Sequence, residues 1–384
     1  MNWKLPLALA ACTLSPVCYA QNPAPAATPV PVSPAAAPEA PPTNVLKLPP
    51  QTVVPSPAPS YAATPGYYTM PFEGDIPSDR MPNYLHVNMS IDGGPTSGYL
   101  VDTGSTGIVV GAEELPHFDP NGEKGDLTYS SSGRKEEGVW QTVTVTFPDA
   151  KYHGPNDGKP HVASAKVRVL AVTHLSCVNM GPNAAGCKPS NNPNPHMLGI
   201  GFGRGALRAV EPNNPFTSLG DMNDGTIRTG YIISHAGIHL GLTDATAAGF
   251  TFQKLLPRTD AKPDKPAGFP KDWITPPGYF AVDGKKSPQG TVLMDTGLGN
   301  MMLALEGESK PAPIAEGTPI TIYLPGGKYH YQFRVGDKTK ATPIKVNWVY
   351  PRSGTYVNTG ERVFNLVDYL YDADGGYLAL RAKQ

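Results

Sequence analysis

Two copies of one short pattern occur in the chain, and this internal repeat limits the possible folds more than any other feature. The first copy is Leu100–Val110 (LVDTGSTGIVV) and the second is Leu293–Leu303 (LMDTGLGNMML). Each copy has two apolar residues, Asp-Thr-Gly, three small or mixed residues and then an apolar run. Asp102 and Asp295 lie 193 residues apart. The repeat therefore predicts two similar lobes, each of which contributes one aspartate.

Short stretches of alternating apolar and polar residues predict that both lobes are built from β-strands. Pro (44) and Gly (41) are abundant among the 384 residues, which favours many turns over long helices. Helical patterns are confined to residues 115–118 and 244–249. We expect an all-β fold, with the lobe boundary near residues 215–230. The clearest strand patterns cover residues 84–91, 138–147, 165–172, 319–324 and 329–335.

The repeated Asp-Thr-Gly is suited to acid–base chemistry. Glycine allows a sharp turn, so that backbone N–H groups can donate to a carboxylate at the end of a buried strand. If the two loops meet, Asp102 and Asp295 cannot both ionise at neutral pH and will share a proton. One carboxyl can then act as a base on water while the other donates to a substrate carbonyl. This chemistry requires neither a metal nor a cofactor.

These residues resemble the pepsin-like family of bilobal aspartic proteases. The likeness covers roughly residues 80–384. It includes His196–Phe202 and Asn358–Phe364, which resemble the family segments that close the loops around the two aspartates. The resemblance implies two β-barrel-like lobes, residues 67–220 and 221–384, with the active-site cleft between them.

The resemblance also implies a function, that of an endopeptidase that hydrolyses peptide bonds in a polypeptide substrate. Asp102 and Asp295 would be the catalytic pair, and Tyr129 would lie on a hairpin flap that covers the substrate. The other residues of the two loops would support the carboxylates: Thr103, Gly104, Ser105, Thr296 and Gly297.

Two positions depart from the family pattern. Leu298 stands where a Ser or Thr usually donates to the second aspartate, and Val109 stands where a tryptophan often supports the flap tyrosine. Because leucine cannot donate, we expect the pair to keep its shared proton to higher pH, with activity shifted toward neutral pH. An alternative hypothesis is a protease-like protein, weak or inactive, that binds a peptide or protein partner in its cleft.

The N-terminus has the features of a bacterial-type signal peptide over residues 1–20. A positively charged start precedes an apolar run, and Ala20 is a suitable cleavage residue. An alternative is lipidation at Cys12, because Leu9–Cys12 resembles a lipobox. Residues 21–66 hold 14 prolines and two charged residues, which predicts a disordered linker. Both alternatives predict an exported protein, either periplasmic, secreted or lipid-anchored to the membrane.

Cysteine usage, net charge and hydropathy each add one expectation. Cys177 and Cys187 flank a Gly/Pro/Asn-rich loop, and in an exported chain this favours a disulfide; two thiols alone would make half a zinc site at best. A formal net charge of −1 argues against a nucleic-acid partner. After the N-terminal segment, the sequence contains no apolar run long enough to span a membrane.

Overall fold

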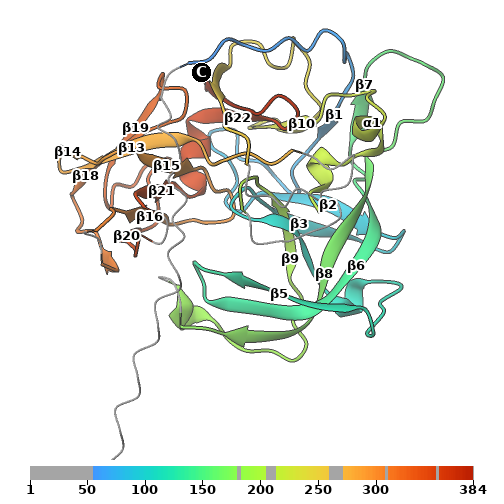
Figure 1. Cartoon of the computed structure of the whole chain (residues 1–384), viewed down its shortest axis with the longest axis horizontal. Helices are drawn as coiled ribbons and strands as arrows, with labels where there is room; N and C mark the ends of the chain where they lie inside the picture. Colours follow the sequence, from blue (N-terminus) through green and yellow to red (C-terminus); the bar gives the residue numbers. More distant parts are fainter. Residues whose placement is uncertain are drawn as a thin grey trace, which may run out of the picture. The chain divides into compact units, whose positions relative to one another are not determined.

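A computed structural model describes residues 55–179, 183–204, 213–258, 271–307, 310–351 and 354–383. The predicted signal peptide, Cys12 and most of the predicted linker lie outside these residues. The described part consists mainly of short β-strands arranged in three sheets, which confirms the all-β prediction (Figure 1). The helical elements in it are one α-helix and four 3₁₀-helices: η1 (Ala112–Glu114), η2 (Ala184–Gly186), η3 (Pro215–Thr217), α1 (Gly220–Asn223) and η4 (Glu361–Asn365).

The first sheet, drawn from cyan to green in Figure 1, contains the first Asp-Thr-Gly. Strand β2 pairs with β6 as well as with β3, so that six of its seven strands close into a ring. The order of its strands is β2 (His86–Ile91), β3 (Thr96–Asp102), β9 (His196–Ile200), β4 (Thr106–Gly111), β8 (Ser164–Cys177), β6 (Arg134–Thr146) and β5 (Glu123–Tyr129).

The second sheet has strands from residues 277–358 and contains the segment that leads into the second Asp-Thr-Gly. Strand β14 (Lys285–Lys286) pairs with β13 at its side. The order of the other strands is β17 (Ala312–Pro313), β20 (Val346–Trp348), β16 (Met301–Ala304), β21 (Tyr356–Asn358), β15 (Gly290–Leu293), β13 (Pro277–Val282), β18 (Pro319–Tyr323) and β19 (His330–Arg334).

The third sheet joins strands from both halves of the chain. Strands β1 and β7 precede residue 154, whereas the others follow residue 229, so a division into 67–220 and 221–384 passes through this sheet. The order is β12 (Thr251–Lys254), β23 (Tyr377–Ala382), β22 (Val367–Asp372), β10 (Gly230–Ser234), β11 (Gly237–Leu240), β1 (Tyr67–Met70) and β7 (Lys151–His153).

The sequence repeat has a counterpart in strand pairing. Strand β3 runs parallel to β9, while β4 is antiparallel to β9 and parallel to β8. In the second sheet β15 runs parallel to β21, while β16 is antiparallel to β21 and parallel to β20. Each Asp-Thr-Gly thus follows a strand with the same pattern of neighbours. One hydrophobic core, which includes Val101, Tyr231 and Val292, extends through all three sheets.

Most of the predicted strands are present, but the two short helices are not. Residues 115–118 and 244–249 form turns or irregular structure. Both segments are only four to six residues long, and so short a helix has too few internal hydrogen bonds to stabilise itself.

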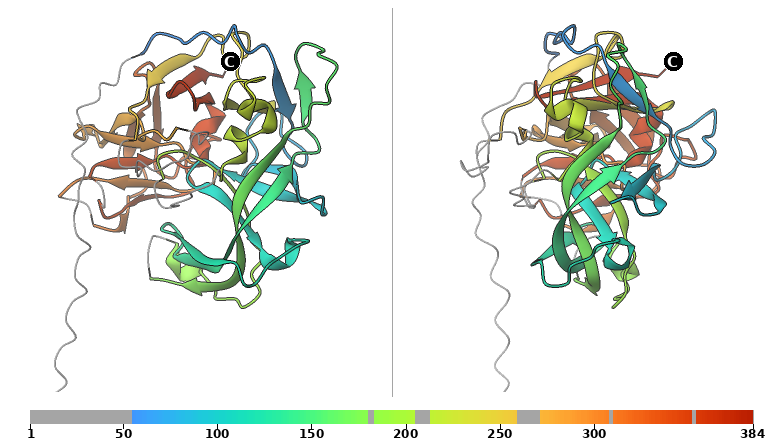
Figure 2. Two further views of the ribbon diagram at one scale, coloured as in Figure 1. Left: turned by 45° about the vertical axis from the view of Figure 1, so that its right-hand side comes forward. Right: turned by 90° about the vertical axis from the view of Figure 1, so that its right-hand side faces the viewer.

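The folded part begins earlier than the predicted linker boundary at residue 66. In Figures 1 and 2 the segment that starts at Pro55, in blue, runs beside the yellow strand β12. The Ser56 amide donates to the Phe252 carbonyl at 2.7 Å. The Tyr61 side chain is buried, and its hydroxyl donates to Asp372 at 3.3 Å. The prediction included residues 55–66 in the linker because it rested on the composition of the whole segment, which is rich in proline. A single tyrosine, Tyr61, hardly changes that composition.

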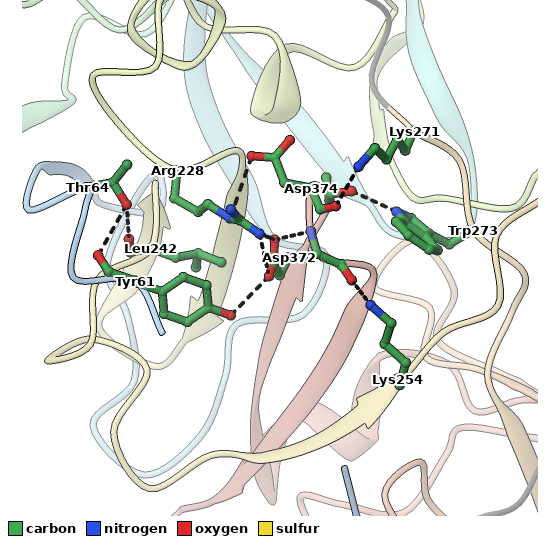
Figure 3. A network of polar contacts seen from close by, with 11 residues as sticks. Tyr61, Thr64, Arg228, Leu242, Lys254, Lys271, Trp273, Asp372 and Asp374 are labelled. Carbon is green, nitrogen blue, oxygen red and sulfur yellow. Dashed lines mark hydrogen bonds and ion pairs between the residues drawn. The ribbon is translucent and has the colours of Figure 1, made fainter. Parts of the chain in front are cut away.

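Figure 3 shows how this segment is held. Asp372, at the end of β22, is completely buried. Its two oxygens accept from Arg228 Nε at 3.1 Å and Nη2 at 3.2 Å, and the Gly375 amide donates to the same carboxylate at 2.8 Å. Tyr61 is therefore attached to a buried carboxylate and its arginine partner at the β22–β23 hairpin.

Candidate functional site

Two loops bring the repeated aspartates into contact. Asp102 is the last residue of β3, and Asp295 follows β15 by two residues. Both side chains are buried, with residue exposures of 5% and 7%. The sequence-predicted pair thus lies at the ends of equivalent strands, below the surface of one cleft.

The threonines of the two loops link them by reciprocal hydrogen bonds. The Thr103 hydroxyl donates to the Met294 carbonyl at 2.6 Å and accepts from the Thr296 amide at 3.0 Å. The Thr296 hydroxyl donates to the Val101 carbonyl at 2.6 Å and accepts from the Thr103 amide at 3.0 Å. Because all these groups are buried, the network fixes one loop against the other.

The glycines hold the two carboxyl groups close together. The Gly104 amide donates to Asp102 Oδ1 at 2.6 Å, and a Cβ added to Gly104 would lie 2.4 Å from Asp295 Oδ2. The Gly297 amide donates to Asp295 Oδ1 at 2.9 Å, and a Cβ there would lie 2.5 Å from Asp102 Oδ1. Each glycine is therefore in contact with both carboxyl groups, and a larger residue would clash with the opposite aspartate.

Each carboxylate has a second hydrogen-bond donor. For Asp102 this donor lies in the same loop, and for Asp295 it lies on a neighbouring strand. Ser105 Oγ donates to Asp102 Oδ2 at 2.5 Å. Leu298 occupies the equivalent position in the second loop, but Asn358 Nδ2 donates to Asp295 Oδ2, also at 2.5 Å. Leu298 itself donates nothing to Asp295, but the aspartate has a side-chain donor from elsewhere in the chain. An amide on the adjacent strand β21 takes the place of the missing hydroxyl.

Burial raises the pKa of Asp295 to about 8, and the negative charge of Asp102 contributes in the same direction. The hydrogen bonds from Asn358 and Gly297 act in the opposite direction, because they stabilise the ionised carboxylate. The two carboxyl groups behave as one coupled system that retains a proton at neutral pH. Such a pair can supply a base and an acid in the same step.

A β-hairpin formed by β5 and β6 extends over this site and carries Tyr129. Tyr129 is the last residue of β5 and is paired with Arg134, so that residues 130–133 form the tip. The Tyr129 ring packs in an apolar cluster with Val109 and Trp140. Burial and the charges of Asp102 and Glu136 raise the Tyr129 pKa well above its usual range.

The predicted disulfide between Cys177 and Cys187 is present. The loop it closes contacts the tip of the hairpin, since the Val178 amide donates to the Gly133 carbonyl at 2.8 Å and the Asn183 amide donates to the Ser131 carbonyl at 3.0 Å. On its other side, Asn183 Oδ1 accepts from Asn300 Nδ2 at 3.2 Å, beside the second aspartate loop. The disulfide loop therefore supports the hairpin tip.

A cleft of about 880 Å³ contains both aspartates, Tyr129 and Leu298. Among the wall residues that were not singled out from the sequence are Glu136, Arg204 and Asn358. Asn358 begins the segment Asn358–Phe364, which in the sequence indicates only a loop-closing segment. Arg204 donates to the Phe202 carbonyl at 3.1 Å and to Thr275 Oγ1 at 2.7 Å. Nothing in the local sequence of Glu136 and Arg204 distinguishes them from other charged residues near glycines.

Within the described ranges no group of three or more His, Cys, Asp or Glu side chains is arranged to hold a metal ion. No helix among the same residues is long and apolar enough to cross a membrane.

No protein-family model matches the chain, and a search of curated proteins finds no match either.

Proposed function

We propose that this chain is an exported aspartic endopeptidase with a pepsin-like bilobal fold. The observation that carries the proposal is the arrangement of Asp102 and Asp295. Each lies at the end of an equivalent strand, each accepts from the glycine two residues on, and their loops are joined by reciprocal threonine bonds. The matching strand pairing around the two loops supports the bilobal fold.

In the proposed mechanism the pair begins with one proton, held on Asp295 because of its raised pKa. Ionised Asp102 removes a proton from a bound water as the water oxygen attacks the peptide carbonyl carbon. Asp295 gives its proton to the carbonyl oxygen, which yields a neutral tetrahedral diol. Transfer of a proton from Asp102 to the amide nitrogen and return of a proton to Asp295 then accompany cleavage of the C–N bond.

Tyr129 and the hairpin tip would cover an extended peptide in the cleft. The cleft volume and its lining by residues of both sheets fit a segment of several residues, and a polypeptide is the substrate class we propose. The alternative of an inactive peptide-binding protein rested on Leu298. Because Asn358 donates to Asp295 instead, the leucine at position 298 no longer favours the inactive protein over the protease.

Export is part of the same proposal. The Cys177–Cys187 disulfide fits an oxidising compartment such as the periplasm or the exterior of the cell. Cleavage after Ala20 and lipidation of Cys12 both remain open as the route by which the chain is processed.

The function is tested by incubating the purified protein with an unfolded protein from pH 3 to 8 and mapping the products by mass spectrometry. We expect cleavage at peptide bonds that is blocked by a transition-state-mimicking peptide and is insensitive to metal chelators and serine-directed reagents. Absence of cleavage at every pH, together with retained binding of the peptide, would favour the binding protein instead.

A further inference from the structure

A buried carboxyl group in the hairpin is not explained by the proposed catalytic pair. Glu136 lies on β6 opposite Leu127, and its side chain has 0% exposure. Its Oε1 accepts from Arg134 Nε at 2.9 Å and lies 2.7 Å from Arg134 Nη2. Its Oε2 is buried and has no hydrogen-bond partner. A buried carboxylate oxygen without a donor is costly, so this atom indicates a partner that the chain itself does not supply.

A second buried polar atom without a partner lies on the same hairpin. The Tyr129 hydroxyl is shielded from solvent and makes no hydrogen bond. Tyr129 pairs with Arg134, two residues before Glu136 on β6, and the charge of Glu136 contributes to the raised Tyr129 pKa. Both residues also line the cleft that contains Asp102 and Asp295. The two unsatisfied oxygens thus belong to residues that line one cleft and lie at diagonal positions of one hairpin.

The surroundings of the Tyr129 side chain are apolar. Tyr129 packs in a cluster of apolar side chains, of which Leu127 and Met197 also line the cleft. The other members of this cluster are Val109, Trp140, Leu170 and Val172. Apolar side chains and a carboxylate that line the same cleft match a long aliphatic stem that ends in a cation.

Arg134 is a cation next to Glu136, but it does not bind both carboxylate oxygens. Both of its contacts are with Oε1, and its side chain is 43% exposed at the hairpin tip. It can therefore turn toward solvent when another cation enters. A lysine ammonium has three donors, which is more than the two unpartnered oxygens require.

We infer that Glu136 is a specificity-determining residue that selects a substrate peptide with a lysine side chain under the hairpin. This inference rests on the proposed peptide-binding cleft and adds the chemical class of one substrate residue. It assigns Glu136 to recognition rather than to the chemical step, because the residue lies beside Tyr129 and not among the donors to the two aspartates.

The test uses two octapeptide series that are identical except that lysine or norleucine is placed at each position in turn. Norleucine keeps the aliphatic stem and removes the charge. For the wild-type protein, kcat/KM at one position should favour lysine by about tenfold or more, as expected for a hydrogen bond to a charged group. In Glu136→Gln the ratio of the two kcat/KM values should fall close to one.

Glu137→Gln is the matched control. Glu137 is the next residue of β6, but its side chain is 36% exposed and pairs with Lys135 and Ser176. This substitution should leave the lysine preference intact. Arg134→Gln, which removes the competing cation, should increase it. A lysine preference that survives in Glu136→Gln, or an Arg134→Gln variant that loses it, would overturn the inference.

Binding measurements separate this inference from the proposed activity. Noncleavable hydroxyethylene versions of the best lysine peptide and its norleucine partner are titrated against the same four proteins. A lysine preference in binding that depends on Glu136, with no cleavage of any peptide, would support the subsite and refute the protease. Cleavage without any lysine preference would refute the subsite and leave the protease standing. Neither cleavage nor discrimination in binding would refute both.

Discussion

Asn358 Nδ2 lies 2.5 Å from Asp295 Oδ2, and this contact supplies the side-chain donor that the second loop itself lacks. Ser105 Oγ donates to Asp102 Oδ2 from within the same loop. In the second loop the donor comes instead from a strand 63 residues further along the chain. The two carboxylates therefore have matching numbers of donors, although the two loops differ in sequence.

Removal of this donor should shift the pH dependence of activity. In Asn358→Leu, Asp295 loses a hydrogen bond that favours its ionised form, so the apparent pKa of the pair should rise. We expect the pH profile of kcat/KM to move to higher pH by about 0.5–1 unit, with lower turnover.

Leu298→Thr in the Asn358→Leu background should move the profile back toward acid, because the hydroxyl returns a donor to the same carboxylate. Leu298→Thr alone should have a smaller effect, since Asn358 already donates. A profile that is unchanged in Asn358→Leu would show that this amide does not control the titration of the pair.

Both aspartates should be required for cleavage. Asp102→Asn and Asp295→Asn should each lower kcat by at least about a thousandfold, because neither carboxyl can act as base and acid in one step. Asp75→Asn, an exposed aspartate far from the two loops in sequence, is the control and should retain full activity. Activity near that of the wild type in either loop variant would exclude the paired mechanism.

The same pair should reduce stability at neutral pH. The folded-state pKa of Asp295 is raised to about 8, whereas an unfolded aspartate titrates near about 3.9. Between these values the folded state holds a proton that the unfolded state releases, so stability falls as pH rises through this window. Asp295→Asn removes the titration and should stabilise the protein at pH 7 by about 1–4 kcal/mol.

Chemical denaturation at pH 4 and pH 7 measures this difference. The stabilisation of Asp295→Asn relative to wild type should be small at pH 4 and clearly larger at pH 7. An equal effect at both pH values would mean that it arises from packing rather than from protonation.

Loss of the disulfide should weaken substrate binding more than it slows the chemical step. The loop between Cys177 and Cys187 donates two backbone hydrogen bonds to the hairpin tip. In Cys177→Ser/Cys187→Ser the tip loses this support, so we expect KM to rise several-fold with a smaller change in kcat. Unfolding free energy should fall by about 2–3 kcal/mol. A reductant should raise KM in the wild type and should not change KM in the double variant. An unchanged KM in the double variant would show that the disulfide does not support the hairpin tip.

Arg228 should be essential for stability, because it neutralises a completely buried carboxylate. Arg228→Met leaves Asp372 without a cation and should cost about 3–5 kcal/mol of unfolding free energy. Tyr61→Phe removes only one hydrogen bond and should cost about 1 kcal/mol. Asp374→Asn changes an exposed partner of the same arginine and should have little effect. Equal losses in all three variants, measured by denaturant unfolding, would contradict this ranking.

Several properties of the protein were determined by the sequence alone. The alternation of apolar and polar residues is local, so it predicted β2, β6, β8, β18 and β19 within a few residues. The repeated Asp-Thr-Gly predicted two equivalent loops, because the same local chemistry places glycine amides beside an aspartate wherever it occurs. The Cys177–Cys187 pair could be inferred because only two cysteines follow the N-terminal segment.

Contacts between distant segments were decided only by the tertiary structure. The amide of Asn358 reaches Asp295 because β21 lies parallel to β15, and strand pairing across more than 60 residues leaves no local trace in the sequence. Tyr61 is buried for a similar reason, since its partner Asp372 lies 311 residues away. In the same way, Glu136 Oε2 becomes buried without a hydrogen-bond donor only when the hairpin is folded. Burial and hydrogen bonding are properties of the assembled chain, and they decide which of many charged residues become functional.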